Sequence, residues 1–192
     1  MANSAEDELR VRILDEAAKL FDEKGMRFTM DDLARSLAMS KKTIYTVFRT
    51  KRSIMTATID RFFAEAYIEQ KAILADSSLS TTEQLRRVIG SVPERYIGHD
   101  LSQLYVLKDR YPSVYRHWHN CREEYWNAVE VLIKKGIQEG NIRQVTMPIL
   151  KSMFQRTIEQ FFQSDILIKN KIAYRDALSE VADILIDGIS VK

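Results

Sequence analysis

The feature that most constrains the fold is a pair of short helical stripes on either side of a four-residue joint, residues 37–40. Apolar residues recur at i, i+3, i+4 and i+7 from Met30 to Leu37, which is the spacing of one buried helix face. A second apolar side is predicted for the run from Lys41 to Phe48. Thr29 and Ser40 stand where N-cap residues belong, so the pattern predicts two capped helices joined by a tight turn.

The second of these helices, residues 41–48, has two different sides on a wheel of about 100° per residue. Ile44, Val47 and Phe48 fall together and form the predicted buried side. The other side and its flanks carry basic and hydroxyl groups, from Lys42, Thr43, Tyr45 and Thr46. A short helix that begins at a capped N-terminus and presents such groups suits the major groove of DNA. The pair of helices therefore predicts a helix-turn-helix.

The distribution of charge supports the same reading more than the net charge does. The whole chain carries only +2, which does not point to a nucleic-acid partner. Residues 33–59, however, contain no acidic residue and six basic ones: Arg35, Lys41, Lys42, Arg49, Lys51 and Arg52. The rest of the chain has 23 basic and 27 acidic residues. A short cationic segment on a slightly acidic chain is the expected electrostatic footprint for phosphate.

The composition predicts an all-α fold, because the 192 residues include only 6 glycines and 3 prolines among many helix formers. A first helix is expected over about 6–24, with Gly25 as its C-terminal cap, and a long helix over about 52–74. Further helices are expected near 82–98, 100–110, 112–139, 147–169 and 172–190, with Pro93 as a kink or early end. The predicted domains are 1–52, a three-helix DNA-binding domain, and 53–192, an all-helical domain joined to it by the long helix.

Other classes of protein find little support. Cys121 is the only cysteine, so no internal disulfide is possible. Neither a signal peptide nor an apolar run of about 20 residues is evident, which predicts a cytoplasmic chain without a membrane partner. His117 and Cys121 have helical i, i+4 spacing, but His119 points elsewhere and no second ligand pair follows, so we expect neither metal nor cofactor. No phosphate loop or nucleophile motif appears, and an enzyme is not expected.

The first 55 or so residues resemble the signature of TetR-type repressors. The resemblance rests on a threonine at 29, the Leu33-Ala34 pair, the turn 38–40, the run 44–48 and a lysine at 51, preceded by a helix ending before Gly25. It implies phosphate contacts at Thr29, Tyr45 and Lys51. It also implies positions close to the bases for Lys41, Lys42, Thr43 and Thr46.

Two positions depart from the family pattern. Ala38 replaces the usual turn glycine, so we expect a joint that avoids a positive φ there. Val47 replaces the His or Tyr that commonly precedes the Phe. Because the wheel turns Val47 toward the core, the expected loss is one phosphate contact and not the fold.

In the resembling family, the larger domain holds an effector pocket, and the last two long helices form a four-helix bundle with those of a partner. Apolar stripes over 147–169 and 172–190 are compatible with such a homodimer, and equally with an internal core. Aromatic residues, which pair apolar bodies with polar tips, are the candidate lining of a pocket for a small, partly apolar effector. The candidates are Tyr96, Tyr105, Tyr111, Trp118, Tyr125, Phe154 and Phe161.

The sequence thus predicts a TetR-like repressor that binds a near-palindromic, double-stranded operator as a homodimer and is released by a small-molecule effector. Three alternatives stay open at this point. The chain could be a non-specific architectural DNA binder, an enzyme that uses Cys121, or a regulator that responds to another protein.

Overall fold

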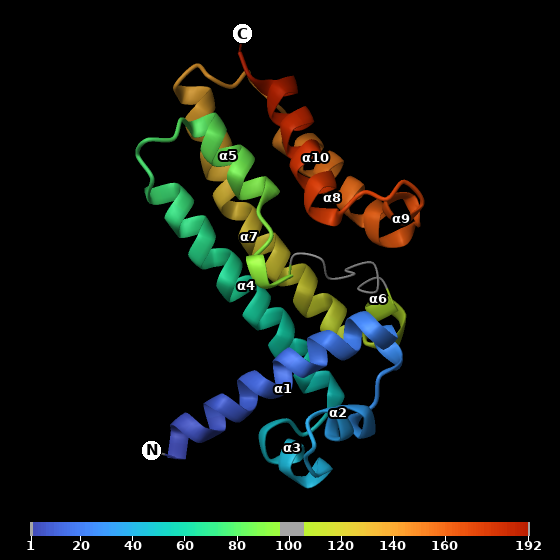
Figure 1. Cartoon of the computed structure of the whole chain (residues 1–192). Coiled ribbons are helices and arrows are strands. Elements are labelled where there is room, and N and C mark those ends of the chain that lie inside the picture. Colours follow the sequence, from blue (N-terminus) through green and yellow to red (C-terminus); the bar gives the residue numbers. More distant parts are fainter. Residues whose placement is uncertain (1, 97–105, 192) are drawn as a thin grey trace. The chain divides into compact units, whose positions relative to one another are not determined.

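The computed structural model describes residues 2–96 and 106–191, and all of their regular elements are helices (Figure 1). The all-α prediction is confirmed. In chain order the elements are α1 (Ala2–Lys24), η1 (Gly25–Arg27), α2 (Met30–Ser36), α3 (Lys41–Val47), α4 (Lys51–Ala75), α5 (Thr81–Gly90), η2 (Glu94–Tyr96), α6 (Val106–Arg110), α7 (Pro112–Gln138), α8 (Met147–Gln163), α9 (Ile166–Lys169) and α10 (Tyr174–Ile189).

The chain forms two compact units. Unit 1 comprises Met1–Arg61 and Gln103–His119, and unit 2 comprises Phe62–Ser102 and Asn120–Lys192. The helices α4 and α7 each contribute residues to both units. None of the described helices is both long enough and apolar enough to cross a lipid bilayer.

The core of unit 1 forms where the predicted stripes meet. Ile13, Ala17 and Leu20 of α1 are at most 4% exposed, as the stripe on that helix predicts. They pack with Leu33 and Ala34 of α2, and with further apolar side chains from α3 and the start of α4. Burial of several such side chains, each contributing about 1.5–3 kcal/mol, stabilises α2 and α3, which are too short to persist alone.

Two polar contacts tie α4 to other parts of unit 1. The guanidinium of Arg61 lies 2.8 Å from Asp15 of α1, and Nε2 of His117 lies 2.6 Å from Oδ1 of Asp60. The side chain of Arg61 is only 15% exposed, so salt screens its attraction to Asp15 less than it would screen a surface pair.

The core of unit 2 is built mainly from α5, α7, α8 and α10. Its fully buried members include Leu85 and Val88 of α5, Ile133 of α7 and Ile186 of α10. The helices α5 and α10 lie side by side (Figure 1), and they are close enough that a Cβ at Gly90 would be in van der Waals contact, at 3.5 Å, with the backbone of Ser179.

Charge–charge contacts continue the pairing of α5 with α10. The guanidinium of Arg86 donates to Asp183 at 2.6 Å and also to Asp187, one helical turn further on. The pKa of Arg86 is raised, chiefly by its hydrogen bond to Asp187 and then by that to Asp183. These contacts fix the rotation of α10 about its axis relative to α5.

The turn after α7 packs closely on that helix. Gly140 has a φ of +76°, and the chain then returns so that the side chain of Ile142 lies directly over Gly136. A Cβ at Gly136 would come within 2.5 Å of Ile142 Cδ1. The backbone of Ile142 is bridged to Ser190, which ties this turn to the end of α10.

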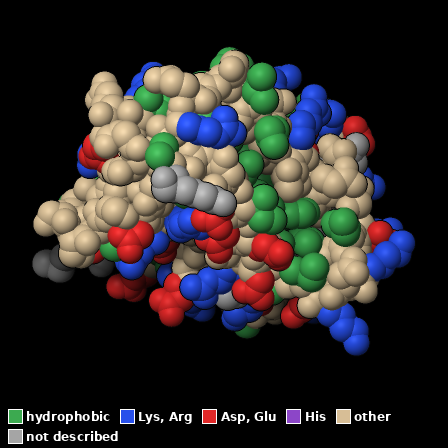
Figure 2. Space-filling view, turned by 90° about the horizontal axis from the view of Figure 1, so that it is seen from above, with side chains coloured by type: hydrophobic (Ala, Val, Ile, Leu, Met, Phe, Trp, Pro, Cys, Tyr) green, Lys and Arg blue, Asp and Glu red, His purple; other side chains and the backbone are tan. Residues whose placement is uncertain are grey.

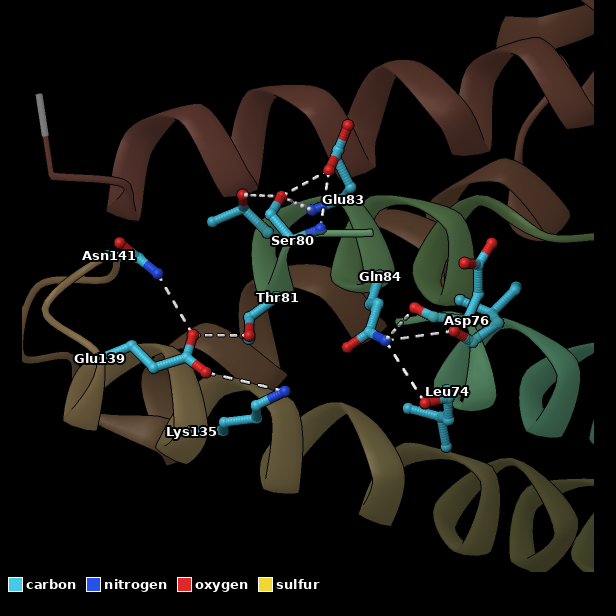
Figure 3. A network of polar contacts seen from close by, with 11 residues as sticks. Leu74, Asp76, Ser80, Thr81, Glu83, Gln84, Lys135, Glu139 and Asn141 are labelled. Atoms are coloured by element: carbon cyan, nitrogen blue, oxygen red, sulfur yellow. Dashed lines mark hydrogen bonds and ion pairs between the residues drawn. The ribbon is translucent and has the colours of Figure 1, made fainter. Parts of the chain in front are cut away.

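A buried side chain closes the end of α4 within unit 2. The amide nitrogen of Gln84, on α5, donates to the carbonyls of Ile73, Leu74 and Asp76 at 3.2–3.4 Å (Figure 3). Gln84 is only 4% exposed. It therefore satisfies carbonyl groups that the last turn of a helix leaves without intrahelical partners.

The neighbouring α5 begins in an equally defined way. Ser80 and Glu83 form a reciprocal capping box, and Thr81 donates to the carboxylate of Glu139 at 2.6 Å (Figure 3). Glu139 also accepts from Asn141, at 3.2 Å, so one carboxylate joins the start of α5 to the turn after α7.

Helix boundaries agree with the sequence for most elements and differ at two. The helix predicted over 82–98 ends at Gly90, with Pro93 in the segment that follows, and its continuation is only the short η2. The helix predicted over 147–169 breaks at Ser164, whose backbone is extended and whose hydroxyl donates to the carbonyl of Gln160. Serine side chains compete with helical hydrogen bonds in this way. Residues 100–105 of the helix predicted over 100–110 lie outside the described part.

Candidate nucleic-acid interface

The start of α2 is fixed by a capping box at Thr29, the residue that the sequence predicts as its N-cap. The backbone N–H of Thr29 donates to the carboxylate of Asp32 at 2.8 Å, and that of Asp32 donates to Thr29 Oγ1 at 3.1 Å. Lys24 Nζ lies 2.8 Å from the same carboxylate. The Lys24 contact first, and the Thr29 contacts next, hold the pKa of Asp32 far below its usual range.

The joint between α2 and α3 is a Schellman turn, and here one expectation was wrong. Ala38 has a φ of +51°, whereas the absence of glycine led us to expect a joint without a positive φ. Its N–H donates to the carbonyl of Arg35, and the N–H of Met39 donates to that of Ala34. These two bonds require a left-handed residue after the helix, and they outweigh the preference of alanine against that conformation.

The two sides of α3 are those that the wheel predicts. Ile44 and Phe48 are 0% and 2% exposed, and Val47 packs partly buried against the same core. Tyr45 is 45% exposed, and Lys42 and Thr46 are also exposed. The Ser40 hydroxyl accepts from the N–H of Thr43 at 3.1 Å, so the N-terminus of the helix is capped. The exposed polar face of α3 is thus held in place by the packing of its apolar side against the core.

Lys41 has a partner that the sequence analysis missed. Its ammonium lies 2.8 Å from the carboxylate of Asp31 on α2, and the hydrogen bond to Asp31 raises the pKa of Lys41. The acid-free segment had been counted from residue 33, which left this carboxylate just outside it. The sequence feature that could have revealed this pair is the acidic residue in the first turn of α2, where a negative charge also interacts favourably with the helix dipole.

Lys51 points toward the protein. Its Nζ donates to the backbone carbonyls of Met26 and Phe28, at 2.8 and 2.5 Å, and lies 4.0 Å from the centre of the Phe28 ring. Burial, followed by the nearby charge of Arg110, lowers the pKa of Lys51 to about 8. In this arrangement the ammonium orders the segment before α2, and its contact with phosphate stays a prediction.

The other predicted DNA-binding residues lie together in unit 1 around α3. Thr29, Lys41, Lys42, Tyr45 and Thr46 are exposed, and Thr43 is partly buried. Arg49 and Arg52, which the charge count had noted but which were not among the proposed contacts, are exposed close to the end of α3 along the chain. The arrangement offers cations and hydroxyl groups to a polyanion, while each individual contact remains a prediction.

Comparison with known proteins agrees with this geometry. Residues 13–58 match the model of the bacterial regulatory proteins of the tetR family. Residues 13–58 thus form the helix-turn-helix domain of the TetR family of transcriptional regulators. The chain is 28% identical over 182 residues to the uncharacterized HTH-type transcriptional regulator YvaF of Bacillus subtilis. The aligned residues make up 93% of this chain and 94% of YvaF. Because the family consists of DNA-binding transcriptional regulators, the prediction that the chain is not an enzyme is confirmed.

Solved structures share the fold over nearly the whole regulator. A regulator from Saccharomonospora viridis, solved in complex with choline, has a TM-score of 0.74 at 19% identity, with 97% of this chain and 100% of that chain covered. FadR from Bacillus subtilis, solved in complex with stearoyl-CoA, has a TM-score of 0.70 at 18% identity, with 93% and 98% covered.

The seven candidate effector residues are divided between the two units. Tyr111 and Trp118 belong to unit 1, and Tyr105 lies outside the described residues. Unit 2 contains the other four, which are Tyr96, Tyr125, Phe154 and Phe161. Within it, Tyr96 and Tyr125 belong to one chain of aromatic rings, while Phe154 stacks on Trp126 with 5.0 Å between ring centres. Their role in effector binding stays a prediction.

Proposed function

We propose that the chain is a repressor that binds a near-palindromic operator as a homodimer and releases it when a small, partly apolar effector binds unit 2. The observation that carries this proposal is the exposed face of α3, with Lys42, Tyr45 and Thr46 on a helix whose root is buried. In a symmetric dimer, two such helices enter successive major grooves about 34–36 Å apart.

Gel-shift titration against the operator tests the DNA-binding part. Lys42→Ala and Tyr45→Ala remove exposed groups of α3 and should each weaken operator binding by about 5- to 150-fold, as expected for the loss of about 1–3 kcal/mol. Lys134→Ala, which removes an exposed lysine from α7 in unit 2, is the matched control. Equal affinity for all four proteins would show that α3 is not the reading helix, and equal affinity for operator and random DNA would favour an architectural binder.

The dimer is supported by apolar side chains that α8 and α10 leave exposed. Ile149 and Met153 of α8 are 60% and 55% exposed, and Ile184 of α10 is 64% exposed. Figure 2, which views the protein from above, shows hydrophobic side chains gathered in a patch beside charged ones. Large exposed apolar side chains on adjacent helices are a usual mark of an interface, and an isologous one would use them twice.

Sedimentation equilibrium tests this interface directly. Ile184→Glu and Met153→Glu should convert a dimer to a monomer, because each would bury two unpaired carboxylates per dimer. Val131→Glu is the control, since Val131 on α7 is also 64% exposed. A dimer that survives both changes, or that Val131→Glu disrupts equally, would place the interface elsewhere.

The effector part is supported by the interior of unit 2. The indole N–H of Trp126 is buried and has no acceptor within hydrogen-bonding distance among the described residues. A buried donor without an acceptor costs free energy that a bound ligand would recover. The similar structures solved with choline and with stearoyl-CoA show that this fold accommodates small molecules with apolar parts.

Reciprocity gives the sharpest test of effector control. If an effector weakens operator binding by a given factor, operator DNA must weaken effector binding by the same factor, typically about 5- to 150-fold. Calorimetry with the free protein and with the protein–operator complex measures this factor. A ligand that binds both equally would not be the effector.

A further inference from the structure

Unit 2 contains a continuous chain of five aromatic rings that joins α4, η2 and α7. Ring centres are separated by 4.9 Å from Tyr96 to Phe62, by 5.2 Å from Phe62 to Phe63, by 6.4 Å from Phe63 to Tyr125, and by 5.8 Å from Tyr125 to Tyr67. The pairs are edge-on or tilted, so their ring faces are not stacked against one another. Such faces carry partial negative charge.

The chain of rings is buried at one part and accessible at another. Phe63 and Tyr96 are only 6% exposed, whereas Tyr67 and Tyr125 are incompletely buried. Tyr125 is nevertheless fixed, because its hydroxyl lies 3.0 Å from Ser91 Oγ and donates to the carbonyl of Val88 at 3.1 Å. A fixed and partly accessible aromatic face is preorganised for a small ligand, which lowers the entropic cost of binding.

One carboxylate from each helix acts on the two accessible rings. Burial raises the pKa of Tyr67, and the carboxylate of Glu124 on α7 adds to this; burial likewise raises the pKa of Tyr125, and Glu69 on α4 adds to it. Among the described residues, neither Glu69 nor Glu124 has an ion-pair partner. Arg95, which precedes Tyr96, lies 3.2 Å from Glu65 and is neutralised by it. The environment of Tyr67 and Tyr125 is therefore aromatic and net negative.

We propose that unit 2 binds an organic ammonium cation on the faces of Tyr67 and Tyr125, beside Glu69 and Glu124. The ring quadrupole attracts a cation within about 6 Å of the ring centre, and the two carboxylates balance its charge over a longer range. The methyl or methylene groups of such a cation also suit the apolar ring faces, while a free carboxylate or phosphate would be repelled. The inference rests on the proposed effector function and specifies the ligand class for that function.

Calorimetry with choline and with its uncharged isostere 3,3-dimethylbutan-1-ol tests this proposal on the unmodified protein. The two probes have nearly the same shape, so the cation should bind at least about 5-fold more tightly if the rings and carboxylates recognise charge. Equal affinities, or tighter binding of the alcohol, would overturn the proposal. Each titration with choline chloride is accompanied by a control titration with the same concentration of sodium chloride.

Variants locate the site. Tyr67→Ala removes one ring face and should weaken choline binding by about 5- to 30-fold, whereas Tyr67→Phe retains the face and should stay close to the original affinity. Glu69→Gln and Glu124→Gln should each weaken choline binding without changing the affinity for the alcohol. Ile68→Ala, at a residue of the same helix that is 68% exposed, is the control. Choline binding that none of the Tyr67 and glutamate changes affects would place the cation elsewhere.

A gel shift with the operator separates this inference from the proposed function. Choline binding with release of the operator supports both, and choline binding without release supports the cation site but refutes its effector role. If stearoyl-CoA releases the operator while choline does not bind, effector control stands and the ligand class proposed here is wrong.

Discussion

The positive φ of Ala38 makes a specific prediction about the turn of the helix-turn-helix. Changing Ala38 to glycine relieves a left-handed conformation that costs an L-residue about 1–2 kcal/mol. Against this gain stands the extra freedom of glycine in the unfolded chain, about 0.5–1 kcal/mol. Ala38 is exposed, so its methyl group contributes little packing. The free energy of unfolding should therefore rise by about 0.5–1 kcal/mol.

Denaturation in urea, followed by circular dichroism, measures this change. Ala64→Gly is the matched control, because Ala64 is also exposed but lies inside α4, where glycine should lower the free energy of unfolding by about 1 kcal/mol. Both substitutions replace an exposed alanine by glycine, but they should change the free energy of unfolding in opposite directions. Hydrogen exchange should also slow at Met39, whose N–H closes the Schellman turn.

A loss of stability in Ala38→Gly would contradict this reasoning. If Ala38→Gly lowers the free energy of unfolding as much as Ala64→Gly does, the joint holds no left-handed residue, and the hydrogen bonds from Ala38 and Met39 are not those of a Schellman turn. Because the turn sets the angle between α2 and α3, operator affinity should stay unchanged or improve slightly in the glycine variant.

Three further predictions concern single contacts. Asp31→Asn should free Lys41 for phosphate and steepen the dependence of log K on log salt by about 0.9 per subunit; Asp176→Asn on α10 should leave the slope unchanged in the same filter-binding assay. Gly136→Ala should lower the free energy of unfolding by about 1–3 kcal/mol, since the new methyl group would overlap the side chain of Ile142; thermal melts would contradict this if the midpoint did not fall. For Lys51, the folded state releases its proton near pH 8 and the unfolded chain only near the ordinary lysine value of 10.5, so the free energy of unfolding should rise from about pH 8 toward pH 10.5; Lys51→Met should remove that rise in urea midpoints, and an equal rise in both proteins would refute it.

Local patterns in the sequence were sufficient for the helices and their caps. The stripes on α2 and α3, the N-caps Thr29 and Ser40, and the position of Val47 on the core side depend only on residues within a few turns, and all were predicted correctly. The break at Ser164 was missed because helix propensity averages over a window and a single hydroxyl does not alter it enough.

Contacts between distant segments were beyond the reach of periodicity. The pairing of Lys41 with Asp31, the inward turn of Lys51 and the bidentate hold of Arg86 on α10 depend on how elements pack, which a wheel for one helix does not contain. The aromatic residues illustrate the same limit. Their density was visible in the sequence, but the ring chain brings Tyr67, which had not been proposed, next to Tyr125 across 58 positions.

The cap that Gln84 places on α4 has a mechanical consequence. The last turn of a helix ordinarily frays, because opening it costs little free energy. Here the terminal carbonyls of α4 are held by a side chain that is itself buried in the next helix. We therefore expect the last turn of α4 to open less readily than a helix end without such a cap.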